Sequence, residues 1–154
     1  MEEFKSTYGH FPRIDTAMSN GPGTHYLDAE RFAVALTGRH LDGTPLAATD
    51  DHVDNIQRRT FYTFSETELD SAKPPHLRDA FGNTQIAVLY DTNGDGIINT
   101  ADVPGGVAPT VSPVSHPERH FAPKFDLANG IHAGVIFYSA GKGESADDIV
   151  YSSQ

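Results

Sequence analysis

The sequence predicts an α+β fold with an antiparallel sheet, because helix-like patterns come first and strand-like patterns come later, without alternation. The helix-like segments lie before residue 40, and the two clearest strand-like runs lie after residue 83. A chain of 154 residues is close to the common domain size of about 100–150 residues. We therefore expect residues 1–154 to form a single domain with long loops.

The first element has the pattern of the end of a helix. Phe4 and Tyr8 are four residues apart and would share one helix face. Gly9 suits the left-handed position that closes a helix, and Pro12 prevents the helix from continuing. We therefore expect a short helix that ends near residue 8.

A second helix is predicted from about residue 25 to residue 37, with Thr24 as its N-cap and Gly38 after its last turn. Its apolar side chains follow the i, i+3, i+4, i+7 spacing of a helix that packs on a core: Ala29, Phe32, Ala33 and Leu36. We expect Phe32 and Leu36 to be buried against the sheet.

Two runs rich in strand-forming residues, Thr84 to Tyr90 and Gly134 to Ser139, are predicted strands. The segment between them is proline-rich from residue 103 to residue 124, which is typical of a loop that wraps around a compact domain. Residues 60–64 alternate weakly and fit either an edge strand or an extended connection.

The composition is acidic, with a formal net charge of −10 and no cysteine. No cluster of basic residues exceeds the Arg58-Arg59 pair, which argues against binding to nucleic acid or to an anionic membrane surface. The apolar runs are far shorter than the ~20 residues of a spanning helix. An acidic surface does favour divalent cations.

The most informative segment is Asp91 to Asp102, which reads Asp-Thr-Asn-Gly-Asp-Gly-Ile-Ile-Asn-Thr-Ala-Asp. This is the spacing of an EF-hand-type calcium loop, in which Gly96 permits the sharp turn at position 6. Calcium prefers six to eight oxygen ligands, at about 2.3–2.6 Å, and alternate residues of a curled chain supply them. The predicted ligands are side-chain oxygens and one backbone carbonyl, that of the seventh position: Asp91, Asn93, Asp95, Ile97, Asn99 and Asp102.

Within this loop the chain resembles one half-site of a dockerin repeat, although a second copy is absent. The alternative is a hairpin tip, because Asn93-Gly94 and Asp95-Gly96 are strong turn signals that follow an apolar run. A plain turn needs only one carboxylate, whereas three in one turn would repel each other without a cation.

Catalytic motifs are incomplete, so we expect no enzyme. Ser139-Ala140-Gly141 matches half of a nucleophile elbow, but Phe137 stands where the first glycine is required. His116 and His120 have the spacing of two zinc ligands, but Pro117 and Pro123 leave little helix to present them together. A zinc site would also need a third ligand.

Five segments in order resemble the soluble part of a type II secretion pseudopilin of the major class, a relative of type IV pilins. The first two are the aromatic-Gly segment where the first helix ends (residues 8–12) and the second helix with its Ala-Leu-Thr-Gly ending (residues 32–38). The other three are an Asp-Ala-Phe-Gly-Asn segment (79–83), a Ser-Ala-Gly segment (139–141) and a closing Asp-Asp-Ile (147–149). The resemblance implies a pilin-like fold, in which a truncated first helix and a short second helix pack on an antiparallel sheet.

The resemblance also implies a second calcium site in the closing loop, with Asp147 and Asp148 as ligands. Lys142-Gly143 stands where the family has an acidic residue, so one ligand is missing and a cation takes its place. The Asp91 loop would then be a moved or an added metal site.

The implied role is structural. Pseudopilins are membrane precursors, cut after a short basic leader, that stack through apolar first helices into a filament assisting protein export. By resemblance, the full-length protein would be anchored in the inner membrane with this domain in the periplasm. Its partners would be other pseudopilin subunits and secretion components, and the isolated domain would be a monomer. We expect the reading frame upstream of Met1 to encode the leader and the apolar helix. The alternative is a free-standing extracytoplasmic calcium-binding module that recognises a protein or a glycan.

Overall fold

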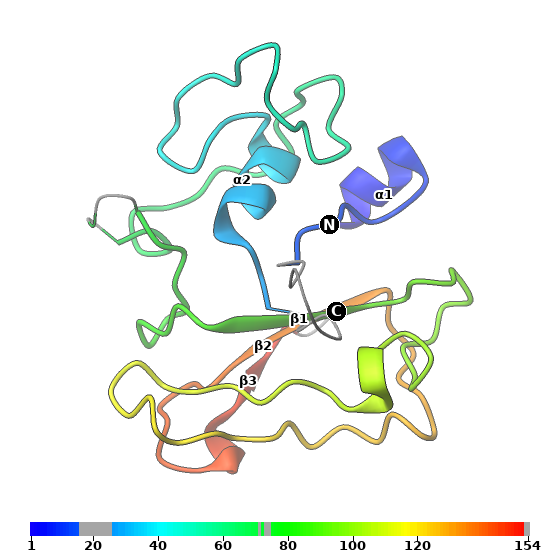
Figure 1. The fold of residues 1–154 in the computed structure, drawn as a ribbon, viewed down its shortest axis with the longest axis vertical. Coiled ribbons are helices and arrows are strands. Elements are labelled where there is room, and N and C mark those ends of the chain that lie inside the picture. Colours follow the sequence, from blue (N-terminus) through cyan, green and yellow to red (C-terminus); the bar gives the residue numbers. More distant parts are fainter. Residues whose placement is uncertain (16–25, 71, 73–74, 153–154) are drawn as a thin grey trace. The chain divides into compact units, whose positions relative to one another are not determined.

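The computed structural model describes residues 1–15, 26–70, 72 and 75–152 (Figure 1). The chain divides into two compact units, one of Met1–Asp15 with Asp28–Leu77 and one of Thr16–Leu27 with Arg78–Gln154. Both described α-helices lie in the first unit and all three described strands in the second. The α+β prediction is therefore confirmed, and the expectation of a single domain stays a prediction.

Helix α1 spans Glu2–Tyr8 and ends where the sequence predicts. Gly9 adopts a left-handed conformation with a φ of 83°, and its N–H donates to the Lys5 carbonyl at 2.7 Å. Phe4 is fully buried, and its ring lies 5.4 Å from the ring of Phe61. The helix is short, so this buried aromatic contact rather than helix propensity holds it in place.

Helix α2 spans Ala29–Thr37 and begins four residues later than predicted. Its N-cap is Asp28, whose side chain accepts the N–H of Arg31 at 3.0 Å. Tyr26 is in a β-bridge, so the chain is still extended there and the helix cannot yet begin. The predicted cap, Thr24, lies outside the described residues.

The buried part of α2 is wider than the predicted stripe, because four consecutive residues are buried: Ala33, Val34, Ala35 and Leu36. The burial of Leu36 is confirmed. Phe32 is only half-buried, with its ring 5.9 Å from the ring of Phe64. The prediction of a buried Phe32 was therefore wrong. Neighbouring loops cover the last two turns of the helix on several sides, which periodicity alone does not reveal.

The sheet consists of β1, Ile86–Tyr90, β2, Val135–Ser139, and β3, Val150–Tyr151, in that order. Both pairings are antiparallel, as Figure 1 shows, and the middle of β1 faces the middle of β2 through Val88 and Phe137. The two predicted strands are confirmed. Residues 60–64 are an extended connection that belongs to none of the described strands, and the N–H groups of Phe61 and Tyr62 both donate to the Leu36 carbonyl of α2.

The core of the second unit combines the sheet with the proline-rich segment: Ala87, Leu89, Ile98, Val103, Val111, Leu127, Ile136, Tyr138, Ala140 and Ile149. Within that segment, Pro104–Gly106 form a short 3₁₀ turn and Val111 pairs with Phe121 in a β-bridge. The Tyr138 hydroxyl donates to the Pro109 carbonyl at 2.7 Å. The segment therefore wraps the core, as predicted. Among the described residues, the helices are too short and too polar to cross a membrane.

Candidate metal centre

The loop of residues 91–102 is anchored at its first residue and at its eighth on the segment that leads into β2. The Asp91 N–H donates to the Gly134 carbonyl at 3.0 Å, directly after β1. Ile98 and Ile131 exchange two backbone hydrogen bonds of 2.9 and 2.8 Å. Because β1 pairs with β2 and not with the chain that leaves the loop, the hairpin-tip interpretation is wrong.

The Asp91 carboxylate accepts three backbone N–H groups of its own loop. Its Oδ1 accepts the N–H groups of Gly94 at 2.6 Å and Asp95 at 3.2 Å. Its Oδ2 accepts the N–H of Gly96 at 2.8 Å. Gly94 and Gly96 have φ values of 79° and 84°, which let the backbone curl around the carboxylate. Asp91 is only 7% exposed, so a negative charge is enclosed at position 1 of the loop.

The next predicted ligands, Asn93, Asp95 and Asn99, each accept one N–H from two residues ahead, over distances of 2.8 to 2.9 Å. These local bonds turn the chain at every second residue, which is how an oxygen-lined loop is built. Within the described part of the chain, Asp95 Oδ2 accepts no hydrogen bond. That oxygen is available to a cation.

Asp102 closes the loop by joining its two ends. Its Oδ1 accepts the N–H and the hydroxyl of Thr92 at 3.0 and 2.6 Å, and its Oδ2 accepts the N–H of Asn99 at 3.0 Å. Burial alone would raise the pKa of Asp102, but the bonds from Thr92, Asn99 and Asn93 lower it below its ordinary value. Asp102 is therefore held as a carboxylate that is 4% exposed.

Ile97, whose carbonyl is the predicted ligand at position 7, is half-buried. Gly130 lies against it, and a Cβ atom built on Gly130 would stand 2.5 Å from the Ile97 Cγ2 atom. Sequence reasoning missed this requirement, because Gly130 is distant along the chain.

The loop does not gather its three carboxylates around one point. Among the described residues, no group of three or more His, Asp or Glu side chains is arranged to hold a metal ion. The predicted donor set also includes the amide oxygens of Asn93 and Asn99 and the carbonyl of Ile97. In this conformation the loop's own N–H groups occupy oxygens that a calcium ion would share.

The closing loop uses its two carboxylates separately. The Asp147 carboxylate forms an ion pair with the Lys124 ammonium. Asp148 Oδ2 accepts the N–H groups of Glu144 at 3.1 Å and Ser145 at 2.9 Å, forming a capping box on the 3₁₀ turn Ala146–Asp148. The hydrogen bond to Asp147 raises the pKa of Lys124 above its ordinary value. The two predicted ligands thus have different partners.

A buried polar network joins two segments that are distant in the sequence. Asn83 is 3% exposed and donates to the Gly141 carbonyl at 2.7 Å and to Asp79 Oδ2 at 2.8 Å. The Ser139 hydroxyl donates to the same Asp79 oxygen. Gly141 is required here, since a Cβ atom would lie 1.9 Å from the Asp148 carbonyl oxygen. The resemblance named residues 79–83 and 139–141 as separate segments and did not predict that they meet.

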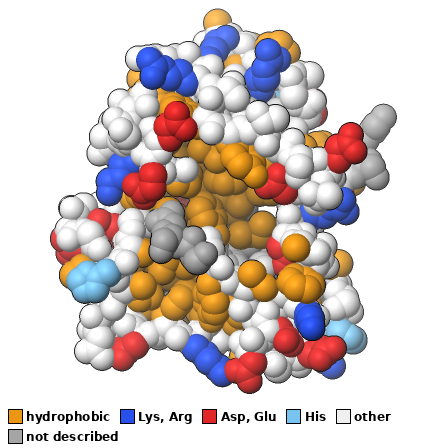
Figure 2. Space-filling model, turned by 180° about the vertical axis from the view of Figure 1, so that it is seen from behind, with side chains coloured by type: hydrophobic (Ala, Val, Ile, Leu, Met, Phe, Trp, Pro, Cys, Tyr) orange, Lys and Arg blue, Asp and Glu red, His pale blue; other side chains and the backbone are white. Residues whose placement is uncertain are grey.

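Acidic and basic side chains are interspersed over the face shown in Figure 2, where no extended basic patch is visible. This agrees with the small number of basic residues in a chain of net charge −10.

No protein-family model matches the chain, and neither a curated protein nor a solved structure matches it.

Proposed function

We propose that this chain is a structural protein without catalytic activity, stabilised by calcium bound in the loop of residues 91–102. The observation that carries the proposal is the enclosure of Asp91 and Asp102. Both are nearly buried, and within the described residues neither forms an ion pair with Lys or Arg. Two enclosed carboxylates without a cationic partner favour a bound cation.

Calcium fits this loop better than a transition metal does. The predicted ligands are all oxygen atoms, which suit a hard cation, and the chain has no cysteine. Calcium also tolerates irregular coordination, whereas magnesium requires a small octahedral shell. Shifts of the Asp91 and Asp95 oxygens from N–H groups toward a shared ion would complete the site.

The more specific proposal is a pilin-like subunit of a type II secretion pseudopilus. Two of the segments that carry the resemblance, residues 79–83 and 139–141, contact each other through Asn83 and Gly141. Such a contact supplies a physical reason for both segments to occur in one chain. The partners would be further pseudopilin subunits and secretion components, and the domain would lie in the periplasm on an inner-membrane anchor.

Calcium titration of thermal unfolding tests the metal site. If calcium binds only the folded chain, a concentration of one hundred times Kd adds about 2.7 kcal/mol to the free energy of unfolding. Magnesium should add less. Asp95→Ala should abolish most of the gain, because it removes the carboxylate with the free oxygen. Asp147→Ala is the matched control and should keep the gain in stability. A melting temperature of the parent protein that millimolar calcium does not change would refute the site.

Filament formation tests the cellular role. The gene is examined for an upstream basic leader and an apolar helix, and the full-length protein is then expressed and cross-linked in the inner membrane. Copies should cross-link to one another, and Asp91→Ala should impair assembly. Absence of the leader and helix would favour the free-standing module, whereas normal assembly of Asp91→Ala would separate the metal from the filament.

A further inference from the structure

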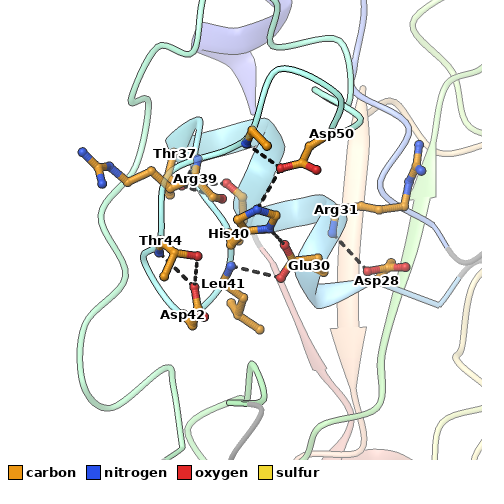
Figure 3. A network of polar contacts seen from close by, with 12 residues as sticks. Asp28, Glu30, Arg31, Thr37, Arg39, His40, Leu41, Asp42, Thr44 and Asp50 are labelled. Carbon is orange, nitrogen blue, oxygen red and sulfur yellow. Dashed lines mark hydrogen bonds and ion pairs between the residues drawn. The ribbon is translucent and has the colours of Figure 1, made fainter.

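A histidine in the first unit has a carboxylate on each side of its ring (Figure 3). The Nδ1 atom of His40 lies 2.6 Å from Glu30 Oε1, and its Nε2 atom lies 3.1 Å from Asp50 Oδ2. Glu30 belongs to the first turn of α2, and Asp50 belongs to the loop that follows the helix. His40 therefore connects the first turn of α2 to the loop around Asp50.

Each carboxylate also accepts a backbone N–H from this loop. Glu30 Oε2 accepts the N–H of Leu41 at 3.0 Å, and Asp50 Oδ2 accepts the N–H of Ala47 at 2.6 Å. The ring and the Leu41 N–H thus hold residues 40–50 against the helix, and the Ala47 N–H folds that segment onto Asp50. Leu41 is buried at this place, so release of the segment would expose apolar surface.

The arrangement requires the charged form of the ring. A neutral imidazole has one N–H and one lone pair, so it can donate to only one of two carboxylates. In the imidazolium both nitrogens donate, and both carboxylates are satisfied. Loss of the proton would aim a lone pair at either Glu30 or Asp50, depending on the tautomer.

The other charged groups around His40 are already engaged. Asp42 accepts the N–H and hydroxyl of Thr44 at 2.9 and 2.7 Å, and Arg39 donates to the Gly43 carbonyl at 3.2 Å. Asp28 caps α2 through the N–H of Arg31.

Two further ionisable pairs lie close to this site. The Arg31 guanidinium lies 3.0 Å from Asp51, next to Asp50. Tyr62, from residues 60–64, lines a second cleft together with His40. The Tyr62 hydroxyl donates to the Glu68 carboxylate. Glu30 and Asp50 therefore remain the two carboxylates that His40 itself must satisfy.

We propose that protonated His40 is a latch that fastens residues 40–50 to the first turn of α2, and that loss of its proton releases this segment. A cleft of about 780 Å³ lies beside the latch, with Glu30, His40, Asp42 and Thr44 in its lining. Release would widen this cleft and uncover Leu41. The proposal is independent of the calcium loop, which belongs to the other unit.

The bond to Glu30 raises the pKa of His40 above its ordinary value of 6.5; partial burial opposes the shift, and the bond to Asp50 adds to it. A raised folded pKa means that the latch is fully effective below about pH 6.5 and is lost as the pH rises through the folded pKa. The segment should therefore open as the pH rises above 6.5 and through the folded pKa of His40.

Imidazole ¹⁵N NMR and amide hydrogen exchange of the whole chain, from about pH 5 to about pH 9, test the latch. His40 should titrate with a midpoint above 6.5, and the Leu41 and Ala47 amides should lose protection through the same midpoint. A midpoint at or below 6.5, or protection that persists after His40 has lost its proton, would overturn the proposal.

Variants separate the latch from general instability. His40→Gln should make the protection of Leu41 and Ala47 low and independent of pH, because glutamine has no proton to lose in this range. His76→Gln is the matched control, because His76 faces only one carboxylate, Asp70, at 3.1 Å in the described chain. This substitution should leave the pH-dependent loss of amide protection at Leu41 and Ala47 unchanged. Should His40→Gln fail to fold, the titration of the parent chain still decides.

Discussion

The loop of residues 91–102 and the closing loop of residues 144–148 carry similar acidic side chains but use them in different ways. In the first, Asp91 and Asp102 are nearly buried and accept N–H groups from several positions of their own loop. In the second, Asp147 pairs with Lys124 and Asp148 completes one capping box. The first loop fits an EF-hand-type calcium pattern, whereas a calcium site in the second is implied only by the resemblance and lacks one ligand. The partners of the carboxylates differ between the two loops.

If calcium binds the first loop as proposed and not the second, the charge of a carboxylate's partner distinguishes a metal site better than the number of carboxylates does. Neutral N–H groups orient Asp91 and Asp102 without cancelling their charge, which remains available to an ion. The ammonium group of Lys124 neutralises Asp147 directly. Calcium at the closing loop would have to displace that ammonium group, and the same displacement is not needed at Asp91.

The largest effect in the absence of calcium is expected for Asp102→Ala. This change leaves the N–H groups of Thr92 and Asn99 without their acceptor, and an unsatisfied partly buried donor costs roughly 1–3 kcal/mol. Urea unfolding in a chelator measures the loss, and a midpoint equal to that of the parent would show that the loop is not held by Asp102.

The dependence of stability on pH provides a control for the role of the Asp102 carboxylate. Because the folded pKa of Asp102 is lowered, its contribution is fully present above the ordinary value of 3.8 and is lost as the pH falls through the folded value. The difference in stability between the parent and Asp102→Asn should therefore shrink in acid. A difference that stays constant down to low pH would assign the effect to packing and not to the carboxylate.

A smaller effect is expected for Asp148→Ala. Loss of a helix-capping carboxylate costs about 1 kcal/mol, and the exposed position of Ser145 and Glu144 limits the cost here. Calcium should not restore the lost stability, as thermal unfolding with and without the ion would show. Full rescue by calcium would mean that the closing loop also binds metal, and the contrast between the two loops would disappear.

The smallest effect is expected for Asp147→Asn. Its ion pair with Lys124 is 65–77% exposed, so solvent and salt screen the attraction. The melting temperature should stay within experimental error of the parent at physiological salt. A marked loss of stability that persists in high salt would show that this pair organises the closing loop.

Several features of the chain are local, and the sequence determined them by itself. The two helix ends follow from Gly9 and Gly38, since glycine reaches the left-handed conformation without steric cost. The two longer strands follow from runs of β-branched and aromatic residues, and the curled loop after β1 follows from alternating Asx residues and glycines. These signals depend on neighbours in the chain, so they can be recognised without a fold.

Tertiary structure alone decided which distant groups meet. The delayed start of α2 depends on a β-bridge of Tyr26 to β1. The separation of Asp147 from Asp148 depends on Lys124, and the need for Gly130 depends on Ile97. A carboxylate has the same local sequence signal whether it faces an N–H group, an ammonium group or a cation. Its partner is determined by packing across the chain, and that partner determines how the carboxylate is used.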